Sequence, residues 1–424
     1  MIYKNRRGGK LQLSPSYRYY FAENAIASVI FSLGTGNFMA GLLNWMGASP
    51  ATCAVIGAFP QLGCVLQLVS PFLFERLKKR KTAVIVCCFL FRFSLGLAGI
   101  IPLLFSGNAL RAVVPIYLVA FLAAGFVTPG LTQWIMDMAP LQQRGRFFAV
   151  RDMISSIANA CVILLMSRAL DALIASGKTR NGYLMVFGTV TLLSLIDAVL
   201  LCHVEETVES KVTGIRPRDM LKPFRDRNYR PVILFICLWF FVQNLSSGFL
   251  SVYQLTVLKM EHSMIAAMSV IATAVGIYVT WCWGKFADMF GWSRLLATGC
   301  VLTGIGYLGW FLLPARLMAL APVLQCITVC GNSAYGMSFQ NIQYFRCPRE
   351  GKTVYIGIEA ALSNLIGYGA VCLGASVQPL LALRFPGEGI PVFFACSAVG
   401  FMACAVFAGK MDSRKSHRRK ENAG

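Results

Sequence analysis

The amino-acid sequence predicts an all-α integral membrane protein in which twelve membrane-spanning helices form two pseudo-symmetric six-helix bundles. Hydrophobic residues make up 57% of the 424 residues and charged residues only 13%, whereas an average globular domain has about 25% charged residues. The hydrophobic residues are gathered into long runs, and a helix of roughly 20 apolar residues crosses about 30 Å of hydrocarbon. Little of the chain is left for a soluble catalytic domain.

The predicted spans follow one another with short connections. They cover residues 17–44, 51–74, 82–105, 111–136, 147–172, 182–204, 231–256, 263–287, 294–314, 318–344, 353–381 and 390–409. The longest polar stretch between spans divides them into six plus six. We therefore predict an N-terminal bundle over 1–204, a cytoplasmic linker over 205–230, a C-terminal bundle over 231–410 and a basic tail over 411–424.

The distribution of basic residues predicts the orientation of the chain. The net charge is +21, but the Lys and Arg residues punctuate the apolar runs and do not gather on one amphipathic face, so we expect no nucleic-acid partner. Most of them lie in alternate connections, the termini included. Because Lys and Arg are retained on the cytoplasmic side, both termini are predicted to be cytoplasmic. The sequon at Asn244 lies inside a span, which fits a bacterial cytoplasmic (inner) membrane.

Similar residues also recur in the two halves of the chain, at a spacing of about 206–213 residues. The corresponding positions are Tyr17-Arg18 with Tyr229-Arg230, Gly36 with Gly248, Glu75 with Asp288, Gly130 with Gly336, and Gly145 with Gly351. Matches in the same order along both halves indicate a duplicated six-helix unit.

Three inner connections resemble motifs of the major facilitator superfamily, bacterial twelve-helix type. The segment Gly284-Lys-Phe-Ala-Asp288-Met-Phe-Gly291-Trp-Ser-Arg294 follows the signature of that family, and Pro71 to Arg80 keeps its acid and basic run but lacks both glycines. The segment from Trp134 to Arg151 is similar to the loop between the fourth and fifth helices of many members. The resemblance implies the fold of that superfamily.

The resemblance also implies a cytoplasmic gate, for which an acid facing the positive end of a neighbouring helix is a physical basis. The gate residues are Glu75, Arg76, Asp137, Arg144, Arg146, Gly284, Asp288, Gly291 and Arg294. Their contacts are expected to form when the inner side closes and to break when it opens. The alternative is that the basic residues only retain the loops inside by charge.

Ionisable residues within a span are costly and are therefore candidates for function. The family architecture implies that the first, fourth, seventh and tenth helices line a central cavity, so Glu23 is the leading proton-coupling candidate, with Asp152 and Glu359 as weaker ones. We expect the partner of Glu23 to be a neighbour one helical turn away. The alternative for Glu23 is an interfacial anchor. Arg92 and Asp197, on outer helices, are expected to pair internally or to reach the interface.

Neutral hydrogen-bonding side chains dominate the helices that the family map places around the cavity. The substrate-cavity candidates are Glu23, Asn37, Thr132, Gln133, Trp134, Gln243, Asn244, Asn332, Tyr335, Gln340 and Asn341. Such groups suit a neutral or polyhydroxylated solute but also occur in drug exporters, and about half are expected only to join helices. The glycine and proline residues of Gly34-Thr35-Gly36, Pro129-Gly130, Gly331 and Gly336 either bend these helices or allow close packing.

These observations predict a secondary transporter or facilitator that moves a small organic solute by alternating access, with uptake coupled to protons or another cation. The alternatives are a drug or metabolite efflux carrier and a transporter-like receptor or lipid-handling protein. An enzyme is not expected, because His203, His262 and His417 are scattered without the spacing of a metal site. Direct coupling to ATP hydrolysis is not expected either, because no phosphate-binding loop is present. We expect membrane lipids as surroundings, no cofactor or metal, and a monomer.

Overall fold

The computed structural model describes residues 15–70, 80–104, 109–138, 144–205, 222–348, 352–384 and 389–411. These residues form helices joined by short turns, and twelve of the resulting helical segments are long and apolar enough to cross a membrane. The spans begin and end within a few residues of the predicted ones, from Ser16–Trp45 to Pro391–Lys410. The predicted end of the second span, 71–74, lies outside the described residues.

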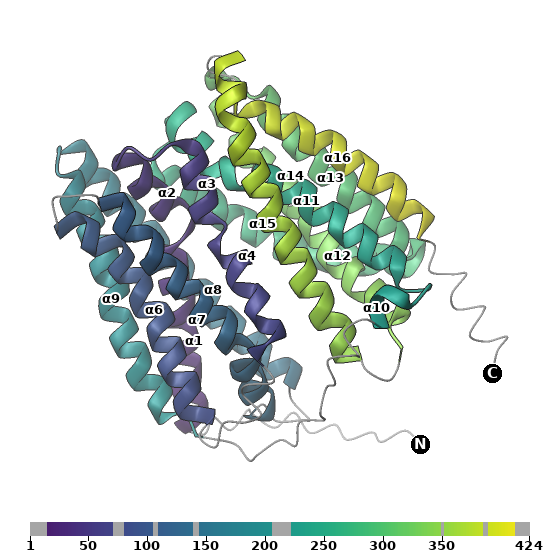
Figure 1. Ribbon diagram of the computed structural model, residues 1–424, viewed down its shortest axis with the longest axis horizontal. Coiled ribbons are helices and arrows are strands. Elements are labelled where there is room, and N and C mark those ends of the chain that lie inside the picture. The colour runs from purple at the N-terminus through teal and green to yellow at the C-terminus, as the bar shows by residue number, and fades with distance from the viewer. Residues whose placement is uncertain are drawn as a thin grey trace.

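The first group of helices precedes Glu205. It consists of α1 (Pro15–Gly34), α2 (Gly36–Trp45), α3 (Pro50–Gly57), α4 (Phe59–Cys64), η1 (Val65–Leu68), α6 (Arg80–Leu104), α7 (Ala109–Met138), α8 (Arg144–Ala175) and α9 (Thr179–His203). Figure 1 shows this group, in purple through blue to teal, on one side of the molecule.

The second group follows in teal through green to yellow on the other side (Figure 1). It consists of α10 (Lys222–Arg225), α11 (Arg230–Val252), η3 (Tyr253–Val257), α12 (His262–Phe290), α13 (Trp292–Leu312), η4 (Ala315–Leu320), α14 (Ala321–Arg346), α15 (Lys352–Arg384) and α16 (Pro391–Lys410). Besides its long helices, this group contains the short helix α10, the π-helical turn η3 and the 3-10 helix η4.

The same packing pattern occurs in both groups. The third span packs against the fourth and the sixth, as α6 against α7 and α9 and as α13 against α14 and α16. The first span packs against the fifth and the sixth, as α1 against α8 and α9 and as α11 against α15 and α16. The pattern agrees with the duplication that the sequence indicates.

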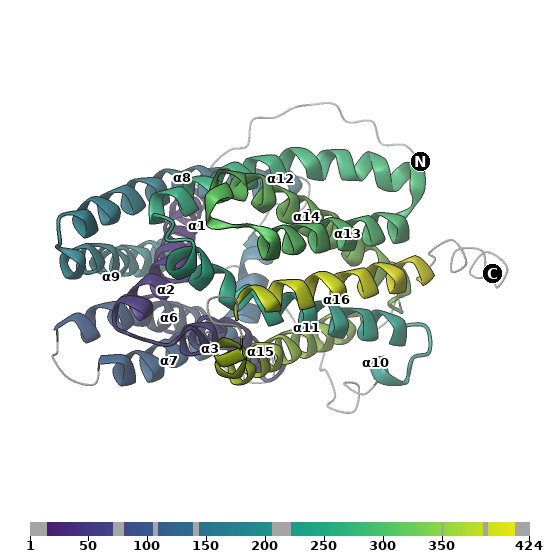
Figure 2. The ribbon, with the colours of Figure 1, turned by 90° about the horizontal axis from the view of Figure 1, so that it is seen from above.

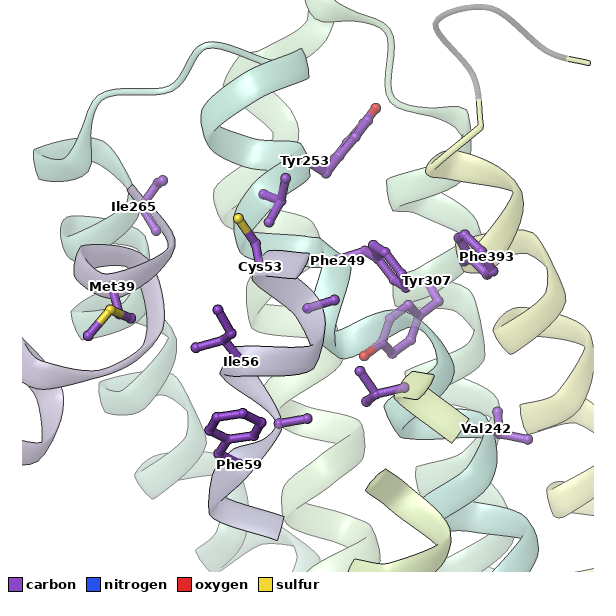
Figure 3. Packing of buried hydrophobic residues seen from close by; sticks show 14 of the residues in the cluster. Met39, Cys53, Ile56, Phe59, Val242, Phe249, Tyr253, Ile265, Tyr307 and Phe393 are labelled. Carbon is purple, nitrogen blue, oxygen red and sulfur yellow. The ribbon is translucent and has the colours of Figure 1, made fainter. Parts of the chain in front are cut away.

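The junction between the groups is also pseudo-symmetric. The second span of each group packs on the fifth span of the other, because α3, α4 and η1 contact α15 while α12 contacts α8. Figure 2 shows both pairs side by side. Apolar side chains fill this junction in Figure 3, where Met39, Cys53 and Ile56 lie beside Phe249 and Ile265 of the other group.

The first span is broken in its outer part. Thr35 separates α1 from α2 in an extended conformation, and Gly36 has a φ of 56° that only glycine adopts without strain. The Thr35 hydroxyl donates to the carbonyl of Phe31 at 2.7 Å, which satisfies an acceptor freed by the helix end. Bending therefore explains Gly36, whereas a Cβ on Gly34 would lie 3.1 Å from the Leu95 side chain, so close packing explains that glycine.

Candidate functional site

Three ionisable side chains from separate helices meet inside the first group. Arg92 of α6 forms an ion pair with Glu23 of α1 at 2.7 Å, and its guanidinium also donates to the carboxylate of Asp197 on α9. The three side chains are at most 7% exposed. One guanidinium between two carboxylates leaves one negative charge uncompensated when all three groups are ionised. We call Glu23, Arg92 and Asp197 the charged triad.

The triad confirms one expectation and corrects another. Arg92 and Asp197 pair internally, as expected for ionisable residues on the third and sixth helices. The partner of Glu23 is not a neighbour one turn away: it is Arg92, 69 positions later in the chain, so that expectation was wrong. Asn24, the next residue, donates instead to Ser155 of α8 at 2.5 Å. A single sequence carries no signal for a contact between distant helices.

The two weaker proton candidates occupy different surroundings. Asp152 of α8 is 60% exposed and pairs with the adjacent Arg151 at 2.7 Å. Glu359 of α15 is half-buried and accepts a hydrogen bond from Gln343 at 3.1 Å, while Gln343 also donates to Tyr229 at 3.0 Å. Glu359 thus has neutral partners, whereas Glu23 has a charged one.

The cavity candidates of the seventh span lie close to the junction. Asn244 of α11 accepts a hydrogen bond from Gln61 of α4, which joins the two groups. Gln243 donates to the hydroxyl of Tyr307 on α13 at 3.3 Å. The side-chain oxygens of Gln61, Gln243 and Gln325 are buried without a hydrogen-bond partner, so three amide acceptors stay available. Sequence reasoning missed Gln61, which lies in the mainly apolar second span and shares it with Gln67.

Three other candidates make contacts within the protein: Trp134 and Tyr335 reach other segments, and Asn341 bonds within its own helix. The indole of Trp134 donates to the carbonyl of Glu205 at 3.0 Å. Tyr335 of α14 stacks on Trp239 of α11, with ring centroids 3.9 Å apart. Asn341 donates to the carbonyl of Met337 one turn earlier at 2.7 Å.

The remaining cavity candidates differ in exposure. Asn37 and Asn332 are half-buried, whereas Thr132 and Gln340 are exposed. The side chain of Gln133 lies outside what the structure describes.

At the end of the junction far from the described chain ends, α8 and α9 of the first group contact α12 of the second. The Asp171 carboxylate accepts hydrogen bonds from the backbone N–H groups of His262 and Ser263, at 3.1 and 2.7 Å. The His262 ring stacks on Phe38 and lies 3.5 Å from the hydroxyl of Tyr183. His262 falls between the predicted spans 231–256 and 263–287, but in the structure it is the first residue of α12 and only 6% exposed.

The second-half signature segment ends α12 at the other end of the molecule. Asp288 and Arg294 are exposed. Gly291 has a φ of 88°, so glycine is needed there to join α12 to α13. A Cβ on Gly284 would meet only the tip of Met337, at 3.4 Å. Glu75 and Arg76 lie outside the described residues, as do the side chains of Asp137, Arg144 and Arg146.

The later glycines of the cavity helices differ in role. A Cβ on Gly331 would lie 2.3 Å from the Thr303 hydroxyl, so close packing of α14 on α13 explains this glycine. A Cβ on Gly336 would meet nothing within 4 Å, so packing gives no reason for a glycine there. Pro129, beside Gly130, lies within α7, whose helix continues to Met138.

Comparisons with known proteins agree with this architecture. Residues 24–370 match the family model of the Major Facilitator Superfamily. No curated protein sequence matches the chain.

Solved structures show the fold over nearly the whole chain. A D-xylose-proton symporter has a TM-score of 0.68 at 17% identity, with 93% of this chain and 97% of that one covered. A mutant of the nucleoside transporter NupG has a TM-score of 0.72 at 9% identity, covering 93% and 99%. The POT family transporter PepTSo has a TM-score of 0.76 at 11% identity, covering 95% and 98%.

Proposed function

The chain belongs to the Major Facilitator Superfamily, and we propose that it takes up a small organic solute together with a proton by alternating access. Membership makes it a multi-pass membrane transporter and not an enzyme. The solute, the coupling ion and the direction of transport are the parts that we propose.

One observation carries the alternating-access mechanism. Each group packs its second span on the fifth span of the other, so two equivalent helix pairs form the junction. Two rigid groups joined in this way can rock about the pseudo-symmetry axis and expose a site near the midplane to each side in turn. The groups correspond to the proposed bundles 1–204 and 231–410, with 205–230 as linker and 411–424 as tail.

The proposed solute is uncharged and carries several hydroxyl groups. The names of the reported similar structures specify D-xylose and nucleosides, so the fold does not select between these classes. The buried amide oxygens of Gln61, Gln243 and Gln325 lack partners and can accept hydrogen bonds from hydroxyl groups. With the half-buried amides of Asn37 and Asn332 they offer neutral groups to such a solute.

The proposed coupling site is Glu23 within the charged triad. A buried cluster of one cation and two carboxylates becomes neutral when it binds one proton, and a neutral cluster avoids the cost of an unpaired charge in low dielectric. Glu23 is the proposed carrier because α1 also contributes Asn24 and Ser28 to the packing against α8. Proton movement on Glu23 can therefore act on the helix that continues into the junction as α2.

The remaining proposals concern the setting. Both termini lie in the cytoplasm of a bacterial cell, and the protein works as a monomer in the inner membrane. The cytoplasmic gate comprises the signature residues, among them Glu75 and Asp288. The exposure of Asp288 and Arg294 fits an inner side that is open.

The test is transport by purified protein in liposomes against a panel of pentoses, hexoses, nucleosides and dipeptides. An inwardly directed proton gradient should drive accumulation of one uncharged polyhydroxylated solute, and an uncoupler should abolish it. Accumulation that persists with the uncoupler would contradict proton coupling. Transport of only charged solutes would contradict the proposed substrate class.

A further inference from the structure

The end of the junction formed by α8, α9, α2 and α12 contains a capping contact across the two groups. The first N–H groups of a helix lack partners within it, and the helix dipole places partial positive charge at that end. In α12 these groups belong to His262 and Ser263, and the carboxylate that accepts from both is Asp171 of α8. Here the first group caps a helix of the second.

The His262 side chain adds an interlocking contact at the same place. Its ring stacks on Phe38 of α2 at a centroid distance of 6.0 Å, and it meets the edge of Tyr183 of α9 at 6.3 Å. A Cβ on Gly41 of α2 would lie 2.6 Å from the His262 ring and 2.7 Å from the Tyr183 hydroxyl. The ring is therefore held in a space that exists only because residue 41 is glycine.

We propose that Asp171 and His262 form a latch that closes the face opposite the termini and must release in every transport cycle. This proposal rests on the alternating-access cycle proposed above. It names the residues that stabilise the state in which this face is closed. When the groups separate at this end, two contacts break at the same time: α12 loses the Asp171 cap, and the His262 ring leaves the space beside Gly41. Both contacts cross the junction, so neither stabilises a single group on its own.

A native cysteine at this junction can reveal separation of the two groups, so no cysteine has to be introduced for labelling. Cys53 of α3 is 4% exposed, and Figure 3 places it beside Phe249 of the other group. Because α3 packs on α11 and α15, separation of the groups at this end uncovers Cys53. Cys300, fully buried inside the second group, serves as the reference for intact folding.

The experiment measures the rate of maleimide modification of Cys53 in detergent, with each cysteine identified by peptide mass spectrometry. Asp171→Ala removes the cap, and Glu261→Gln is the matched control. Glu261 is also acidic and lies at the same helix end, but its contact with Ser263 stays within the second group. In detergent the modification rate does not depend on the orientation of the protein in a membrane, and the measurement needs no solute or coupling ion.

Asp171→Ala should speed modification of Cys53 about tenfold, as the loss of a charged cap with two hydrogen bonds implies. Glu261→Gln should leave the rate within about twofold of the parent, because an exposed charge contributes little. Modification of Cys300 should stay slow in both variants. An unchanged Cys53 rate in Asp171→Ala, or an equal increase in Glu261→Gln, would overturn the latch.

A second variant covers the case in which Asp171→Ala exposes Cys300 and so does not fold. Gly41→Ala leaves the cap in place and fills the space between the His262 ring and the Tyr183 hydroxyl. It should also speed modification of Cys53 while Cys300 stays protected, and an unchanged Cys53 rate would overturn the latch. The cysteine rates and transport in liposomes test different claims. If the rates change as expected but no transport is found, the proposed solute or coupling is wrong and the latch is still supported.

Discussion

Arg92 and Glu23 form an ion pair of 2.7 Å between the third and the first span, although 69 positions separate them in the chain. The same guanidinium reaches Asp197 on the sixth span, so one basic side chain joins three helices. The contact connects the proposed proton carrier to the interior of the first group and keeps it away from lipid.

The first prediction concerns the carrier itself. Glu23→Gln keeps the shape of the side chain but cannot exchange a proton, so uphill uptake driven by a proton gradient should fall at least about tenfold. Exchange of solute across the membrane needs no net proton movement and should be retained. Gradient-driven uptake as fast and as pH-dependent as in the parent would show that Glu23 is not the coupling site.

The second prediction compares the cation of the triad with one of its anions. Arg92→Gln leaves two buried carboxylates without a counter-charge and should cost about 3–5 kcal/mol of stability. Asp197→Asn leaves Arg92 paired with Glu23 and should cost far less. The thermal transition of each variant in detergent provides the measurement, and a larger loss for Asp197→Asn would contradict the assigned charge balance.

The sequence predicted the architecture well because its signals are local. Twenty-residue apolar runs and loop charge depend on neighbours in the chain, and the spans of the structure match them closely. The ion pairing of Arg92 followed from the cost of a lone charge in a span. Its partners did not, since the contacts of Arg92 with Glu23 and of Asp171 with α12 join helices that no local pattern connects.

The third prediction concerns the cytoplasmic gate. Asp288→Asn or Glu75→Gln should reduce turnover several-fold while solute affinity changes little, because the carboxylate stabilises one closed state and does not contact the solute. Equilibrium binding and initial transport rates on the same preparation separate the two effects. Loss of binding at a normal exchange rate would contradict the gate assignment.

The fourth prediction tests movement at the junction with an engineered cross-link. A Cβ on Gly248 of α11 would lie 3.3 Å from the Cβ of Ala54 on α3, close to the spacing of about 3.5–4.5 Å found in disulfides. Oxidation of Ala54→Cys combined with Gly248→Cys should therefore join the two groups. Transport should stop on oxidation and return on reduction.

The control for the cross-link lies within one group. A Cβ on Gly182 of α9 would lie 3.3 Å from the Cβ of Leu173 on α8, so Leu173→Cys with Gly182→Cys gives a cross-link of similar length. Its oxidation should leave transport nearly unchanged, and the single-cysteine variants exclude reactions of the native cysteines. Equal inhibition by both cross-links would argue against separation of the groups at α3 and α11.

The most direct test of the central claim is solute flux in liposomes that contain only this protein, with a proton gradient as the sole source of energy. The account predicts accumulation of an uncharged polyhydroxylated solute above its outside concentration, abolished by an uncoupler and by Glu23→Gln. Binding of such a solute without any flux, in either direction and at any proton gradient, would contradict it.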